Sequence, residues 1–156
     1  MRKRITRDQA GMLREISPWL DIENIAQVEV TSEDPAHPIE RAIMLDSTSG
    51  WRAGESGEQI IRLVFDEPQN IATLRLVFFD DRNERDQEFS IHWSQCEGGG
   101  QKHIVRQQYN FSPDGAIQER EQFAVELHEA KILELRIIPD RGGGGALASL
   151  EELRVA

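Results

Sequence analysis

The chain has 156 residues, of which 38% are hydrophobic and 29% are charged, and its formal net charge at pH 7 is −10. This length fits one domain with one core, and the share of apolar residues excludes general disorder. The strong negative charge repels phosphate backbones and anionic lipid surfaces, so it disfavours both a nucleic-acid partner and a membrane partner.

The first segment of the chain, residues 1–18, is predicted to be an arm or a short helix. Met12, Leu13 and Ile16 share one helical face, and Pro18 marks the end. The basic start resembles part of a secretion signal, but polar and charged residues stand where the apolar core of a signal should be. No apolar run approaches the roughly 20 residues that span a bilayer, and a single cysteine, Cys96, gives no sign of an oxidising compartment. We therefore expect a cytoplasmic protein.

The next segment, residues 19–30, changes to strand-like alternation, with Ala26, Val28 and Val30 on one side. The sequence TSEDPAHP, residues 31–38, interrupts this strand with two prolines and is expected to be an exposed loop. A half-apolar segment then leads into a small polar loop, residues 46–50, and Trp51 stands at its exit. In an all-β sandwich, a polar loop between two apolar segments is a natural place for a metal or a ligand.

The clearest period-two alternation lies in residues 61–65 and residues 74–78. Ile61, Leu63 and Phe65 alternate with other side chains, and the second segment repeats the pattern. The turn-forming sequence DEPQN lies just after the first segment. The two segments are therefore predicted to be antiparallel neighbours joined by a short turn.

Further short strands are predicted in the second half of the chain. They cover residues 88–94, 103–111, 122–128 and 131–140, with a terminal strand around Leu153 and Val155. About eight strands separated by turn residues favour an antiparallel β-sandwich. We predict an all-β fold, a jelly roll, in which residues 19–156 form a single domain.

Three segments, taken in order, carry a resemblance to a known family: PIERAIMLDSTSGW, EFSIHWSQCEGGG and LELRIIPDRGGGGALASLEELRV. Their order and spacing resemble the discoidin-type, or coagulation factor V/VIII type C, domains. This resemblance implies a galactose-binding-like jelly-roll sandwich, a scaffold that these domains share with many carbohydrate-binding modules.

The resemblance also implies one structural Ca²⁺ between the first loop and the end of the last strand. The matching positions are Asp46 and Thr48, with Ser47 beside them, and Glu152 near the C-terminus. Oxygen donors of this kind suit Ca²⁺, which takes about 6–8 of them. In the alternative interpretation, Asp46 caps a turn and Glu152 is a solvated edge residue.

A ligand surface is predicted on the polar side of residues 103–111 and around the exit of the polar loop. The candidate residues are Trp51, Arg52, Arg85, Arg106, Gln108 and Tyr109. The indole face of Trp51 could pack against the C–H face of a sugar ring. The alternatives are that Trp51 packs in the core and that the polar strand residues are an ordinary sheet exterior.

The sequence contains no G-x-S-x-G motif, no Walker loop and no zinc-ligand spacing. We therefore do not expect an enzyme, and we expect no cofactor besides the Ca²⁺. The first hypothesis, by resemblance, is a non-catalytic module that binds carbohydrate through loops at one end of the sandwich. The alternative is a cytoplasmic protein–protein interaction or assembly domain on the same scaffold, either as one chain or as an oligomer.

Overall fold

A computed structural model of the chain describes residues 18–47 and 49–156. The predicted arm over residues 1–18 lies outside these residues, apart from Pro18. The described part contains two single-turn helices, α2 (Ile22–Ile25) and α3 (Glu40–Ile43). Its strands are β1 (Ala26–Val30), β2 (Trp51–Ser56), β3 (Gln59–Phe79), β4 (Arg85–Ser94), β5 (Lys102–Phe111), β6 (Gln118–Ile138), β7 (Leu147–Leu150) and β8 (Glu152–Val155).

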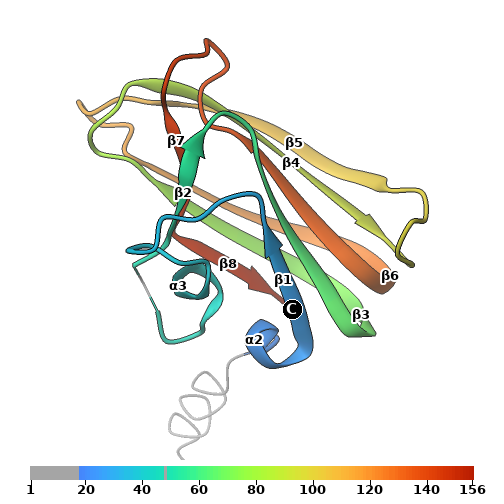
Figure 1. Ribbon diagram of the computed structural model, residues 1–156. Coiled ribbons are helices and arrows are strands. Elements are labelled where there is room, and N and C mark those ends of the chain that lie inside the picture. The colour runs from blue at the N-terminus through green and yellow to red at the C-terminus, as the bar shows by residue number, and fades with distance from the viewer. Residues whose placement is uncertain (1–17, 48) are drawn as a thin grey trace, which may run out of the picture.

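All strand pairs in the described residues are antiparallel. The main sheet has the order β1-β3-β6-β4-β5, and β8 pairs with β3 outside this path, while β2 and β7 form a separate two-stranded sheet (Figure 1). The predicted antiparallel β-sandwich with a terminal strand is therefore confirmed. Neither helix in the described part of the chain has the length or the apolar character that crossing a membrane requires.

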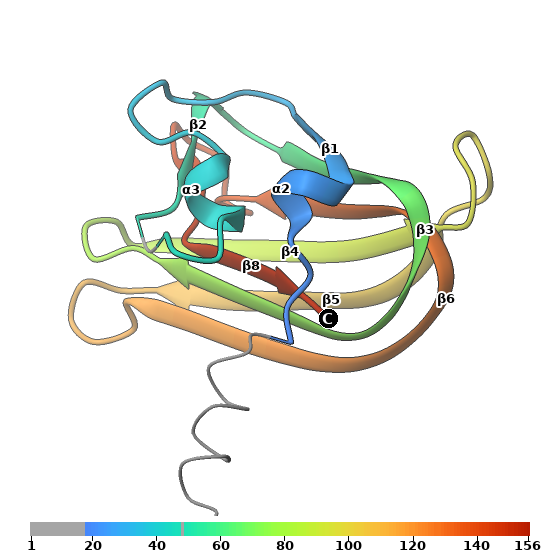
Figure 2. The ribbon, with the colours of Figure 1, turned by 90° about the horizontal axis from the view of Figure 1, so that it is seen from below.

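The two longest strands, β3 and β6, curve together and contribute to both layers of the sandwich (Figure 2). The first half of β3 pairs with β1 and the second half pairs with β8, while β6 follows β3 on its other side. The predicted turn after Phe65 is wrong, because the sequence DEPQN produces register shifts and a bend instead of a reversal. Pro68, which has no backbone N–H, lies where β3 has no paired residue in β6. The predicted strands at 122–128 and 131–140 are likewise parts of the single strand β6.

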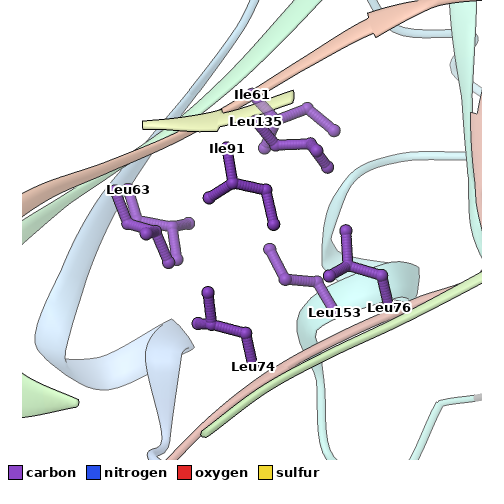
Figure 3. A pocket seen from close by; sticks show the side chains of 8 residues that line it. Ile61, Leu63, Leu74, Leu76, Ile91, Leu135 and Leu153 are labelled. Carbon is purple, nitrogen blue, oxygen red and sulfur yellow. The ribbon is translucent and has the colours of Figure 1, made fainter. Parts of the chain in front are cut away.

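The hydrophobic core lies between the layers, and the inward residues alternate along the strands as the sequence predicted. Ile61, Leu63 and Phe65 are buried, and Trp93 of β4 belongs to the same cluster. Figure 3 shows a cavity between the layers that is lined only by aliphatic side chains. Its volume is about 10 Å³, the least that a single water molecule requires. This cavity is therefore a gap in core packing and not a ligand site.

Candidate ligand-binding groove

A groove of about 500 Å³ lies where three segments that are distant in the sequence meet. It is lined by Arg52 of β2, by residues 79–83 at the end of β3, and by residues 145–147 and Ser149 before and in β7. We call this hollow the loop-end groove. The pairing of β2 with β7 (Figure 1) brings Arg52 opposite Ser149. The groove therefore has one wall from the paired strands β2 and β7 and one wall from the loop after β3.

The loop wall is shaped by Asp80, which accepts hydrogen bonds from the backbone N–H groups of Arg82 at 2.9 Å and of Asn83 at 3.0 Å. This Asx-type turn reverses the chain between β3 and β4. Burial favours the protonated acid, but these two bonds and a hydrogen bond from Arg85 outweigh it and lower the pKa of Asp80. The carboxylate is thus ionised at neutral pH and fixes the loop.

Arg85 supports the groove from the interior, since its side chain is only 1% exposed. Its guanidinium donates to Asp80 Oδ2 at 2.7 Å, to Gln87 Oε1 and the Pro139 carbonyl at 3.0 Å each, and to Ser149 Oγ at 3.5 Å. It also lies 4.5 Å from the centre of the Phe111 ring. The prediction that Arg85 belongs to an exposed ligand surface is therefore corrected. Its planar fork of donors ties the loop wall to the residue that follows β6 and to β7.

The groove exposes an aromatic ring. Phe79 is 40% exposed, and Leu147 across the groove is 41% exposed. Phe79 follows the fully buried Phe78 directly, so the alternation of a strand turns its side chain to the outer face. The sequence analysis missed Phe79. The signal available was the pair of phenylalanines at the end of a strand, of which only one can point inward.

Charged and amide side chains surround this aromatic ring. Arg82 is 84% exposed and lies 3.9 Å from Asp81, while Asn83 is also exposed. The guanidinium of Arg52 is exposed and has no hydrogen-bond or ion-pair partner among the described residues. Arg52 is therefore one of the predicted site residues, and it is free to contact a ligand in the loop-end groove.

Trp51, the neighbour of Arg52, points to the other side of β2. It is 1% exposed and belongs to the core cluster, and its indole N–H donates to the Ser32 carbonyl at 3.3 Å. The interpretation of Trp51 as a sugar platform is corrected, and the alternative that it packs in the core is the one the structure supports.

The three candidates from β5 lie away from the loop-end groove, on two faces of the strand. Arg106 forms a 2.7 Å ion pair with Glu88, and Gln108 donates to the same carboxylate at 3.3 Å. The bond from Arg106, which outweighs burial, lowers the pKa of Glu88. Tyr109 points to the opposite face, where its hydroxyl donates to the Gln118 carbonyl at 2.8 Å and its ring contacts Phe111. The predicted single surface of these residues and Arg85 is therefore not formed.

The structure describes two of the three candidate metal ligands, Asp46 and Glu152. Asp46 is exposed, Thr48 lies outside the described residues, and Glu152 forms a 3.2 Å ion pair with Arg154. The described ranges 18–47 and 49–156 bring no three His, Cys, Asp or Glu side chains together in a way that could hold a metal ion.

A buried polar chain runs inward from the groove. Gln87, which accepts from Arg85, donates at 3.1 Å to Glu119 Oε1. The other oxygen, Oε2, is buried and accepts no hydrogen bond from the described residues. Burial, with the nearby carboxylate of Glu121, raises the pKa of Glu119 to about 7. Glu119 therefore keeps its proton well above the pH at which an exposed glutamate loses it.

This shift predicts a pH dependence of stability. The pKa is about 7 in the folded state and roughly 4.3 in the unfolded chain, so the unfolded state releases this proton first as pH rises. The contribution of Glu119 to stability is complete below the unfolded value, falls between the two values, and is fully lost above pH 7. Glu119→Gln should remove this dependence of stability on pH. Melting temperatures at pH 5, 6, 7 and 8 would measure it. Glu126→Gln is the control, because Glu126 is an exposed residue of the same strand. Parallel curves for the two variants would contradict the assignment.

No family model matches the sequence, and a search of curated proteins found no match. Solved structures do match the fold. CBM32-3 from a family 31 glycoside hydrolase of Clostridium perfringens aligns with a TM-score of 0.66 and 16% identity over 88% of this chain and 93% of that chain. A pectin-binding carbohydrate-binding module aligns with a TM-score of 0.59 and 22% identity over 85% of this chain and 90% of that chain.

A third match is the family 32 carbohydrate-binding module of C. perfringens NanJ in complex with galactose, with a TM-score of 0.59 and 16% identity over 88% of this chain and 96% of that chain. The chain is thus similar along most of its length to isolated modules. At these identities the comparison establishes the fold, which is the galactose-binding-like jelly roll shared with discoidin-type domains.

Proposed function

We propose that the chain is a non-catalytic module that binds carbohydrate in the loop-end groove. The observation that carries this proposal is the exposed ring of Phe79 beside the free guanidinium of Arg52. Sugar rings offer an apolar C–H face to an aromatic side chain and a rim of hydroxyl groups to planar hydrogen-bonding groups. Asp81, Arg82 and Asn83 supply such groups next to Phe79.

The charge of Arg52 adds an expectation about the class of sugar. A guanidinium with no partner in the described residues is suited to pair with a carboxylate in two parallel hydrogen bonds. Sugars that carry a carboxylate, as in pectin, therefore belong in the test beside neutral galactose-type sugars. Fold similarity to a pectin-binding module and to a module in complex with galactose supports the choice of this panel.

The test is binding of the chain to neutral and acidic oligosaccharides, followed by titration calorimetry on those that bind. Phe79→Ala should weaken binding about fivefold or more, because a contact with an aromatic face contributes around 1 kcal/mol or more. Leu45→Ala serves as the control, since Leu45 is 41% exposed, close to the 40% of Phe79, but lies outside the groove. It should leave the affinity unchanged, and both variants should keep the melting temperature.

Two outcomes would contradict the proposal. In the first, a sugar binds equally well to the chain and to Phe79→Ala, which places the site elsewhere. In the second, no sugar of the panel binds. The exposed Phe79 and Leu147 would then be tested as contacts to a protein partner, as the alternative hypothesis requires.

A further inference from the structure

The loop that follows α3 is tied to the C-terminal strand β8 by one buried arginine. The side chain of Arg154 is 4% exposed. Its Nη1 donates to the Ala42 carbonyl at 2.9 Å, and its Nη2 donates to the carbonyls of Met44 at 3.0 Å and Ser47 at 3.4 Å. Its Nε lies 3.2 Å from Glu152 Oε1. Nη1 also donates to the Leu153 carbonyl at 3.0 Å. Four backbone carbonyls and one carboxylate therefore converge on a single guanidinium.

Such a convergence of oxygens is unstable without a positive centre. Buried carbonyl groups that lack a donor lose their hydrogen bonds to water without replacement, and a carboxylate among them adds repulsion. Neutral and charged oxygens of this kind are also the donors that Ca²⁺ prefers, at about 2.3–2.6 Å. Because the guanidinium is already within hydrogen-bond distance of these oxygens, it leaves no space for an ion in contact with the same atoms.

We infer that Arg154 takes the place of a structural Ca²⁺ in this chain. Its guanidinium joins the α3 loop to β8, between which the resemblance implies a Ca²⁺, and it neutralises Glu152. The side chain suits this role because it presents five N–H donors in a fixed plane and keeps its charge throughout the physiological pH range. The loop continues through Gly50 into β2, the strand that carries Arg52. Arg154 therefore also holds this strand in place, and no metal ion is needed for it.

The experiment measures the melting temperature in EDTA and in millimolar Ca²⁺. A ligand that binds only the folded state raises this temperature. The chain itself should give the same value in both buffers. Arg154→Ala should melt roughly 10 °C lower in EDTA, because one partner of a buried ion pair is removed. Ca²⁺ should recover at least half of that loss, since the freed carbonyls and Glu152 then accept the ion. Arg154→Ala/Glu152→Gln should lose this recovery.

Arg141→Ala is the matched control, because Arg141 pairs with Asp86 at the surface; it should change neither value by more than a few degrees. A rise in the melting temperature of the unaltered chain with Ca²⁺ would overturn the inference. So would an Arg154→Ala variant that is destabilised but unaffected by Ca²⁺, since Arg154 would then only cap the loop. If that variant does not fold in either buffer, Arg154→Met, which keeps the aliphatic packing, is measured by the same criteria.

Discussion

Arg85→Ala is expected to lower the free energy of unfolding by about 3–5 kcal/mol. The guanidinium of Arg85 is buried and bonds to the carboxylate of Asp80, the carbonyl of Pro139 and the side chain of Gln87. Its removal leaves Asp80 ionised without its cation and the other groups without their donor. It also removes the contact with the ring of Phe111. The loss should appear as a lower midpoint in urea unfolding.

Two further variants separate the charge of Arg85 from its shape. Arg85→Lys keeps the charge but loses the planar fork, so it should recover only part of the lost stability. Arg82→Ala removes an arginine three residues earlier that is 84% exposed, and its effect should remain within about 0.5 kcal/mol. An Arg85→Ala variant as stable as Arg82→Ala, but unable to bind the sugar, would return Arg85 to the ligand surface.

The fold was largely predictable because alternation along a strand is a local signal. Ile61, Leu63 and Phe65 showed the period of two in the sequence, and they are the residues that face the core. The connection between strands was not predictable from the same signal. Turn residues around Pro68 mark both reversals and bends, and only the pairing of β3 with β6 along its length shows that the chain bends.

The candidate groove lies at the loop end that the sequence hypothesis named, but most of the predicted residues do not line it. The hypothesis put the ligand at loops on one end of the sandwich, and Arg52 lies in such a groove. The β5 candidates were grouped by composition, although Gln108 and Tyr109 are adjacent in a strand and so point to opposite faces. The contacts of Arg154 could not be predicted, because four of its five partners are backbone carbonyls, which every residue carries.

Trp51→Ala is the second variant with a large expected effect, a loss of about 3–5 kcal/mol in the free energy of unfolding. The indole is 1% exposed in the core, so truncation leaves a cavity beneath β2. Trp51→Phe keeps most of the apolar volume and loses the bond to the Ser32 carbonyl, so a smaller loss is expected. Thermal and urea unfolding of both variants would measure these effects.

The neighbouring residue provides the opposite test, because Trp51 and Arg52 point to opposite sides of the same strand. Arg52→Met should keep the stability and weaken sugar binding, whereas Trp51→Phe should lower the stability and keep the affinity of the folded fraction. If Trp51→Phe were instead fully stable and bound sugar poorly, the indole would be a ligand platform after all. The two effects therefore distinguish a residue that builds the groove from a residue that lines it.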